Sequence, residues 1–209
     1  LIGGNLSSSE KLFIDITALG EVEPELMVKR SGANPGDSVF VSGTLGDSAL
    51  GLKMLLNDQI KNKNEILISK HLHPLPRLAL GRELALKKIA TSMIDISDGL
   101  LLDLERVTVH KGSGAKIELS EIPTSKEYDE YIYQFTYNNY ELALSGGEDY
   151  ELLFTSPEER RGDIRKISRD LSIKITEIGK VTRDSKIDLI NINGEKTTSK
   201  QRGFVHFNN

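Results

Sequence analysis

The segment Ile94–Gly99, which reads IDISDG, holds two carboxylates around a serine and ends in a glycine. The apolar pair Met93–Ile94 predicts a short buried strand, and the leucines after the segment recur at the spacing of an amphipathic helix. Asp98 is therefore placed to cap that helix. Carboxylates at a strand end either cap a helix or hold a hard cation such as Mg²⁺ against a phosphate. Capping does not need Asp95, and an unpaired buried carboxylate is costly, so Asp95 favours the cation.

A second acidic cluster lies at Gly146–Glu151, which reads GGEDYE. Three carboxylates at a tight turn repel one another unless cations or hydrogen-bond donors offset their charge. The cluster therefore favours a binding site, with a solvated turn as the alternative.

Three further segments could contact anions. The double glycine in Gly3–Asn5 would let the backbone approach a ligand, although these are also ordinary turn residues. Arg30 matches the geometry of phosphate, although a solvated surface pair with its neighbour Lys29 is equally ordinary. Gly43–Ser48 is a strand-to-helix turn that lacks the lysine of a P-loop, and its Asp47 could simply cap the helix.

The two histidines of the segment His71–Arg77, HLHPLPR, do not predict a zinc site, because a third and a fourth ligand are missing nearby. The prolines of this segment cannot continue a helix. We therefore expect it to end one helix and to order the turn that leads into the next.

Composition excludes several classes of function. The chain has 209 residues, a net charge of −4, no cysteine and no tryptophan. This charge argues against a general nucleic-acid binder, and the absence of cysteine excludes a disulfide framework and suits a reducing cytoplasm. No apolar run is long enough to span a membrane. The chain begins with Leu1 rather than Met, which we interpret as a cut inside a longer protein.

Strands and helices alternate along the chain, which predicts an α/β or α+β fold with a layered mixed sheet and flanking helices. Strands are expected at residues 12–19, 38–42, 93–94, 115–119, 150–155 and 173–181, and a hairpin with a type I′ turn is expected at Asn193–Gly194. Helices are expected after the turn at 43–48, at 65–70, at 78–89, from residue 100, over most of 128–144 and at 157–171. The turn formers at 30–37 indicate a loop or a domain boundary.

Taken together, the motifs resemble the thiamine-monophosphate kinase family of the aminoimidazole ribonucleotide synthetase superfamily. The matching segments occur in the family's order over nearly the whole chain: GGN (3–5), RSGANPGD (30–37), SGTLGDSALGL (42–52), HLHPLPR (71–77), IDISDGLLLDL (94–104), SGGEDYELLFT (145–155), IGKV (178–181) and RGFVHF (202–207). ISDGL together with GGEDYEL is the most specific of these signals.

The resemblance implies an enzyme that moves the γ-phosphoryl group of ATP onto thiamine monophosphate with Mg²⁺. It implies the following roles: Gly4, Asn5, Arg30 and Ser97 contact ATP, Asn5, Asp95 and Asp98 hold Mg²⁺, and Glu148 and Phe204 contact the thiamine moiety. The acceptor phosphate is already ionised near neutral pH, so the transfer needs positioning and charge stabilisation rather than a general base.

The resemblance also implies a missing part. Residues 1–29 would be the remnant of an N-terminal domain that binds ATP and forms a homodimer, and residues 30–209 would be the C-terminal α/β domain of the aminoimidazole ribonucleotide synthetase-like fold. We therefore expect this chain alone to be inactive. Two alternatives remain: another synthetase of the superfamily that uses ATP on a different acceptor, and a non-catalytic binding domain. Neither explains the motifs on the substrate side.

Overall fold

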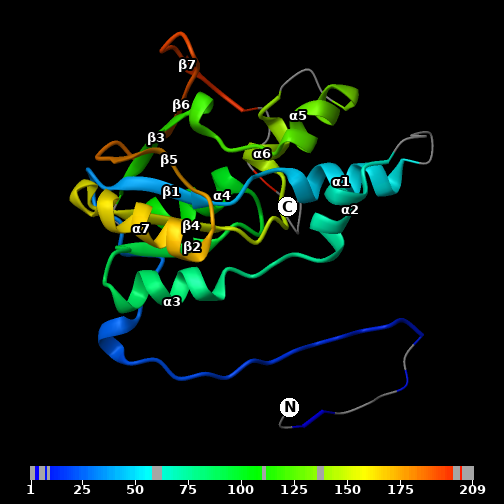
Figure 1. The fold of residues 1–209 in the computed structure, drawn as a ribbon, viewed down its shortest axis with the longest axis horizontal. Coiled ribbons are helices and arrows are strands. Elements are labelled where there is room, and N and C mark those ends of the chain that lie inside the picture. The colour runs from blue at the N-terminus through cyan, green and yellow to red at the C-terminus, as the bar shows by residue number, and fades with distance from the viewer. Residues whose placement is uncertain are drawn as a thin grey trace.

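One mixed sheet with helices on both faces forms the body of the protein (Figure 1). The structure, a computed structural model, describes residues 3–4, 8, 10–57, 63–109, 112–135, 139–199 and 203. The helices are α1 (Asp47–Leu56), α2 (Glu65–Leu72), α3 (Leu78–Leu86), α4 (Leu100–Thr108), α5 (Lys126–Tyr131), α6 (Glu141–Ser145) and α7 (Arg161–Leu171). The strands are β1 (Ser38–Ser42), β2 (Ser92–Asp95), β3 (Gly114–Glu118), β4 (Leu152–Ser156), β5 (Ile175–Thr182), β6 (Ile187–Ile190) and β7 (Lys196–Thr197). The layered α+β class is therefore confirmed.

The strand order is β2-β4-β1-β5-β3-β6-β7, with every neighbouring pair antiparallel except β3 and β6. In β1, Val39 and Val41 point to one face and Phe40 to the other, because successive side chains alternate along a strand. The face with the valines is covered by α1, α2, α4, α5 and α6. On the opposite face Phe40 stacks on Phe154 of β4, with ring centroids 5.2 Å apart, beneath α3 and α7.

The strand expected at 12–19 does not form within the described chain. Residues 11–23 form no strand, and every one of them is exposed, including Leu12 and Phe13. A strand needs a neighbour to accept its backbone hydrogen bonds, and no other part of the described chain pairs with this segment. In Figure 1 it runs apart from the sheet as the blue end of the ribbon.

Several boundaries differ from the expected ones. The region 128–144 is broken into α5, a 3-10 turn at Ile132–Gln134 and α6, rather than one long helix. The helix that was expected over 78–89 ends at Leu86. The hairpin between β6 and β7 has only Gly194 with positive φ, at 78°, and not Asn193. Its three-residue loop is thus a turn followed by a left-handed glycine, not a type I′ turn, which would require positive φ at both central residues.

Within the described chain, no helix combines the length and the apolar character that crossing a bilayer requires.

Candidate functional site

The loop after β2 carries the first acidic motif. Asp95 ends β2 with an exposed side chain, and Ile96 is completely buried. The backbone N–H groups of Ser97 and Asp98 donate to the same carboxylate oxygen of Asp103, at 3.1 and 3.0 Å. Asp103 is buried, which raises its pKa, while these hydrogen bonds oppose the rise. The loop is therefore held in shape by a carboxylate from the first turn of α4.

Asp98 does not cap α4, contrary to the sequence prediction. The N-cap is Gly99, whose φ of 111° favours glycine, and no side chain caps the helix. The Asp98 carboxylate instead pairs with the Arg106 guanidinium at 2.6 Å, and Arg106 also donates to Asp103 at 2.7 Å. The Asp98 side chain therefore serves the loop and Arg106 rather than the start of the helix.

The second acidic loop lies directly against the first. The N–H of Glu148 donates to the Ser97 carbonyl and the N–H of Tyr150 to the Ile96 carbonyl, both at 2.9 Å. The N–H of Ile96 donates back to the Glu151 carbonyl at 2.8 Å. These bonds extend the pairing of β2 with β4 beyond the strands, and they bring together two motifs that are about fifty residues apart in the sequence.

The contact between the loops depends on glycine and on unusual backbone angles. A Cβ on Gly147 would lie 2.4 Å from the Ser97 carbonyl oxygen. Glu148 and Tyr150 have φ values of 66° and 50°, a left-handed conformation that costs free energy in residues other than glycine. Such strain persists only where the surroundings enforce it, and it is concentrated at functional sites.

The predicted carboxylates converge on Tyr150. Burial is the main cause that raises the pKa of the Tyr150 hydroxyl, and the negative charges of Glu148, Asp95 and Asp98 raise it further. The backbone pairing of the two loops thus brings the segments that carry Asp95, Asp98 and Glu148 into one region of the molecule. Cations, or the cationic part of a ligand, would be attracted there.

Asp149 has a structural role that the sequence did not reveal. Its carboxylate accepts hydrogen bonds from the N–H groups of Gly46, at 2.7 Å, and Ser48, at 3.1 Å, and so caps α1 from a distant loop. Burial raises the pKa of Asp149, and the two hydrogen bonds oppose the rise. Asp47, which we considered as the cap, instead accepts from the hydroxyls of Thr44 and Ser125, at 2.7 and 2.6 Å.

An ion pair that we did not predict lies under the second loop. Arg77 donates to both carboxylate oxygens of Glu151, at 2.6 and 2.5 Å, and the Ser42 hydroxyl donates to Glu151 at 2.5 Å. The same hydroxyl accepts from the N–H of Leu152 at 2.9 Å. Both charged side chains are mostly buried, at 18% and 5% exposed. The two partners lie 74 residues apart, so no local pattern in the sequence indicated the pair.

His71, in the last turn of α2, also reaches this loop. Its Nδ1 atom lies 3.0 Å from the Ser48 hydroxyl oxygen and 3.6 Å from Oε2 of Glu148. The sequence analysis gave this histidine only the role of ending a helix. The helix does end one residue later, at Leu72.

Other predicted site residues are not gathered here. Gly4 is exposed, and a Cβ on it would meet nothing within 4 Å. Arg30 is exposed. Gly32, two residues later, packs on Thr91, just before β2 begins, whereas Asp95 lies at the other end of that strand. Asn5 and Phe204 lie outside the described residues. A Cβ added to Gly203, the residue before Phe204, would lie 2.6 Å from the Asp98 carbonyl oxygen. Residue 203 therefore lies against the first acidic loop.

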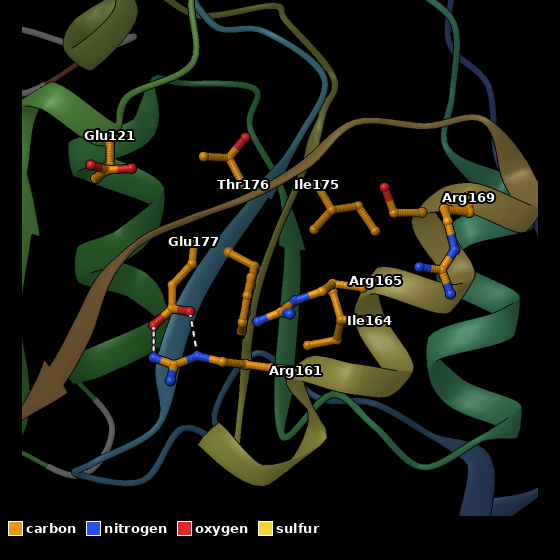
Figure 2. A pocket seen from close by; sticks show the side chains of 10 residues that line it. Glu121, Arg161, Ile164, Arg165, Arg169, Ile175, Thr176 and Glu177 are labelled. Atoms are coloured by element: carbon orange, nitrogen blue, oxygen red, sulfur yellow. Dashed lines mark hydrogen bonds and ion pairs between the residues drawn. The ribbon is translucent and has the colours of Figure 1, made fainter.

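Two hollows in the described chain differ in their position relative to the acidic loops. One of about 330 Å³ adjoins the second acidic loop and is lined by residues of α1, α2 and the segment 73–77, together with Asp149 and Glu151. A larger one of about 500 Å³ lies between α7 and β5, with Arg161, Arg165 and Arg169 on its wall (Figure 2). In it Arg161 donates to both carboxylate oxygens of Glu177, at 2.6 and 2.5 Å. Among the described residues, none of the site residues predicted from the sequence lines either hollow.

The residues present suit Mg²⁺ bound together with phosphate. The described part of the chain holds no group of three or more His, Cys, Asp or Glu side chains arranged for a metal ion. Mg²⁺ commonly takes one or two carboxylates and completes its coordination with phosphate oxygens and water. Asp95 and Asp98 provide two such carboxylates on neighbouring turns of one loop.

The fold and the paired acidic loops define an α+β domain of a known family. The chain belongs to the family described as AIR synthase related protein, C-terminal domain, whose model matches residues 34–191. Among individual proteins, it is similar to thiamine-monophosphate kinase of Buchnera aphidicola subsp. Acyrthosiphon pisum, with 39% identity over 210 residues. That match covers 99% of this chain and 64% of the relative, so the chain spans less than two thirds of the relative's length.

Solved structures agree with this assignment. The crystal structure of thiamine-monophosphate kinase from Stenotrophomonas maltophilia K279a matches with a TM-score of 0.74 at 30% identity, over 84% of this chain and 56% of that one. A structure described as AaThiL complexed with AMPPCP and TMP matches with a TM-score of 0.71 at 37% identity, over 86% of this chain and 54% of that one.

Proposed function

We propose that the protein to which this chain belongs transfers the γ-phosphoryl group of ATP to thiamine monophosphate and so forms thiamine diphosphate. The observation that carries the proposal is the backbone pairing of the loops 96–98 and 148–150, which gathers Asp95, Asp98 and Glu148 around Tyr150. The similarity to thiamine-monophosphate kinases over 99% of the chain supports this choice of substrates.

Asp95 and Asp98 are the residues that would hold Mg²⁺. When bound, Mg²⁺ supplies positive charge between two polyanionic reactants. The exposed Asp95 carboxylate is available for this, and the Asp98 carboxylate is oriented by Arg106 at the same loop. The side chain of Ser97, between the two, would reach a phosphate oxygen.

Catalysis would rest on positioning rather than on proton transfer. The phosphate of thiamine monophosphate is ionised near neutral pH, so its oxygen can attack without a general base. The contribution of the chain is then to hold donor and acceptor in line and to stabilise the charge that spreads over the transferred group. Gly4, Asn5 and Arg30 would contribute from the N-terminal part of the site.

Glu148 would bind the opposite end of the acceptor. Thiamine carries a cationic ring, which suits a carboxylate and the face of an aromatic residue such as Phe204. The Glu148 side chain is 53% exposed, so it can reach a ligand without losing the backbone contacts of its loop.

The N-terminal remainder is also part of the proposal. Residues 1–29 would belong to a second domain that completes the ATP site and joins two copies into a homodimer, and the protein would act in the cytoplasm. This chain alone would therefore not catalyse the phosphoryl transfer.

The test is an assay of thiamine diphosphate formation by the complete gene product, with Asp98→Ala and with Asp188→Ala as a control. Asp188 lies on β6 and pairs with Lys196, outside the acidic loops. We expect the Asp98 variant to lose at least about 100-fold in kcat, as is typical when charge stabilisation of the transferred group is removed. The control should keep its activity. Equal activity of both variants, or no product from the unmodified protein, would overturn the proposal.

A further inference from the structure

We propose that His71 is a positioning residue that fixes the carboxylate of Glu148 and thereby sets the affinity of the site for the cationic end of its substrate. This inference rests on the proposed function, because it takes Glu148 as the group that meets the thiamine moiety. It concerns a histidine for which the sequence motifs gave no role beyond ending a helix.

His71 contacts the Glu148 carboxylate directly, and the two side chains differ in their exposure to solvent. Nδ1 of His71 lies 3.6 Å from Oε2 of Glu148 and 3.0 Å from the Ser48 hydroxyl oxygen. The histidine side chain is 16% exposed, whereas that of Glu148 is 53% exposed. The buried partner is therefore the fixed one, and the exposed partner is the one that needs to be held. When Nδ1 carries a proton, it attracts the Glu148 carboxylate across a distance typical of an ion pair rather than of a hydrogen bond.

Glu148 needs such a contact because only its backbone is fixed. Its N–H donates to the Ser97 carbonyl, and its φ of 66° is enforced by the loop. Its carboxylate lies 3.6 Å from Nδ1 of His71. Ordering a free glutamate side chain on binding costs conformational entropy. A partner that orders it beforehand reduces this cost and tightens binding.

His71 is itself held by a closed ring of contacts. The Ser48 N–H donates to Asp149, the residue after Glu148, while the Ser48 hydroxyl contacts His71. The helices that carry Ser48 and His71 touch closely, since a Cβ on Gly51 of α1 would lie 2.1 Å from the Leu67 carbonyl oxygen of α2. Movement of the histidine relative to the loop would therefore disturb the start of α1 as well.

The experiment compares His71→Ala, His71→Asn and His73→Ala in the complete gene product. His73 is exposed and lies two residues further along, at the end of the same helix, so it is a matched control. We expect His71→Ala to raise KM for thiamine monophosphate about fivefold to tenfold, because the cost of ordering Glu148 returns. KM for ATP should stay within about twofold, since the ATP side of the site is untouched.

His71→Asn should restore most of the affinity, because its amide can place an N–H near the position of Nδ1. The His73 variant should match the unmodified protein. Unchanged KM values in His71→Ala would overturn the proposal. So would equal increases for both substrates, or a loss that His71→Asn shares in full, because these outcomes indicate a merely structural role.

A measurement that does not depend on catalysis distinguishes a failure of this inference from a failure of the proposed function. If the complete protein makes no thiamine diphosphate, the ring resonances of His71 can still be compared by NMR between the unmodified protein and Glu148→Gln. A shift confined to His71 supports the positioning contact. Identical His71 resonances in the two proteins would overturn it, whatever the substrate.

Discussion

The carboxylates of the site divide into two kinds by their partners. Asp103 and Asp149 are bound by backbone N–H groups, and Glu151 is bound by a guanidinium and a hydroxyl. These three hold loops and a helix start in place. Asp95 and Glu148 are exposed and remain available for a ligand. The acidic motif GGEDYE therefore contains two residues for architecture and one, Glu148, to which the proposed function assigns binding.

The buried Tyr128 supports this architecture and gives a dependence on pH. Its hydroxyl donates to the Asn139 carbonyl at 2.8 Å, and burial holds its pKa well above the usual value. The unfolded chain loses the phenolic proton near pH 10, while the folded protein keeps it. The contribution of this group to the free energy of unfolding is therefore fully present below about pH 10, and it falls as the pH rises above that value.

Tyr128→Phe should remove this dependence. Near pH 7 the variant should be less stable by about 1–3 kcal/mol, because the hydroxyl donates to the Asn139 carbonyl and accepts from the Ala143 N–H, and both bonds are lost. This gap should narrow between about pH 9 and pH 11, since only the unmodified protein loses stability through this group. Urea unfolding of both proteins at several pH values measures it. Stability curves that run parallel up to pH 11 would contradict the prediction.

At the scale of elements, the two acidic loops touch because neither has a side chain at the contact. Gly147 packs on the Ser97 carbonyl, and Gly99 packs on the backbone of Ser145. A side chain at either position would separate the loops and move Glu148 away from Asp95 and Asp98. The double glycine is thus required by the distance between two backbones.

Gly147→Ala tests this directly, with Gly162→Ala as its control. The added Cβ at residue 147 would lie 2.4 Å from the Ser97 carbonyl oxygen, whereas nothing lies within 4 Å of one at residue 162 in α7. We expect the first variant to lose about 1–3 kcal/mol of stability and most of its activity. The second should be unchanged, or more stable by up to about 1 kcal/mol. Thermal unfolding and the product assay measure both, and equal behaviour of the two variants would refute the steric argument.

The sequence predicted most elements of the domain, because strands such as Ser38–Ser42 and helices such as α4 have strong local patterns. It also placed Asp95, Asp98 and Glu148 in one site. It could not reveal that Asp149 caps α1 or that Arg77 pairs with Glu151, since these partners are about 100 and 74 residues apart. The predicted cap of α4 was wrong because Gly99, not Asp98, occupies the N-cap position, and the Asp98 carboxylate pairs with Arg106.

At the scale of the whole molecule, the described chain leaves an apolar segment without a partner. Leu12, Phe13, Ile14, Ile16 and Leu19 are each at least three-quarters exposed. Exposed apolar runs of this kind mark surfaces that meet another part of a protein. We propose that residues 12–19 pair as a strand with the N-terminal domain expected for this family.

Hydrogen exchange measured by mass spectrometry tests this pairing. Amides of residues 12–19 should exchange rapidly in the 209-residue chain and slowly in the complete gene product. Residues 38–42 of β1 should be protected in both and serve as the internal reference. Rapid exchange at 12–19 in both proteins would show that the segment has no strand partner.

The position of β4 determines when the site can exist. This strand enters between β1 and β2, where Phe154 pairs with both Phe40 and Met93, although it follows them in the chain by 114 and 61 residues. Contacts between such distant residues form slowly, because a long loop must close first. During synthesis, a nascent chain that has emerged only as far as α4 has the first acidic loop but lacks the second loop that pairs with it. The ligand-binding surface therefore appears late in folding, after β4 has left the ribosome.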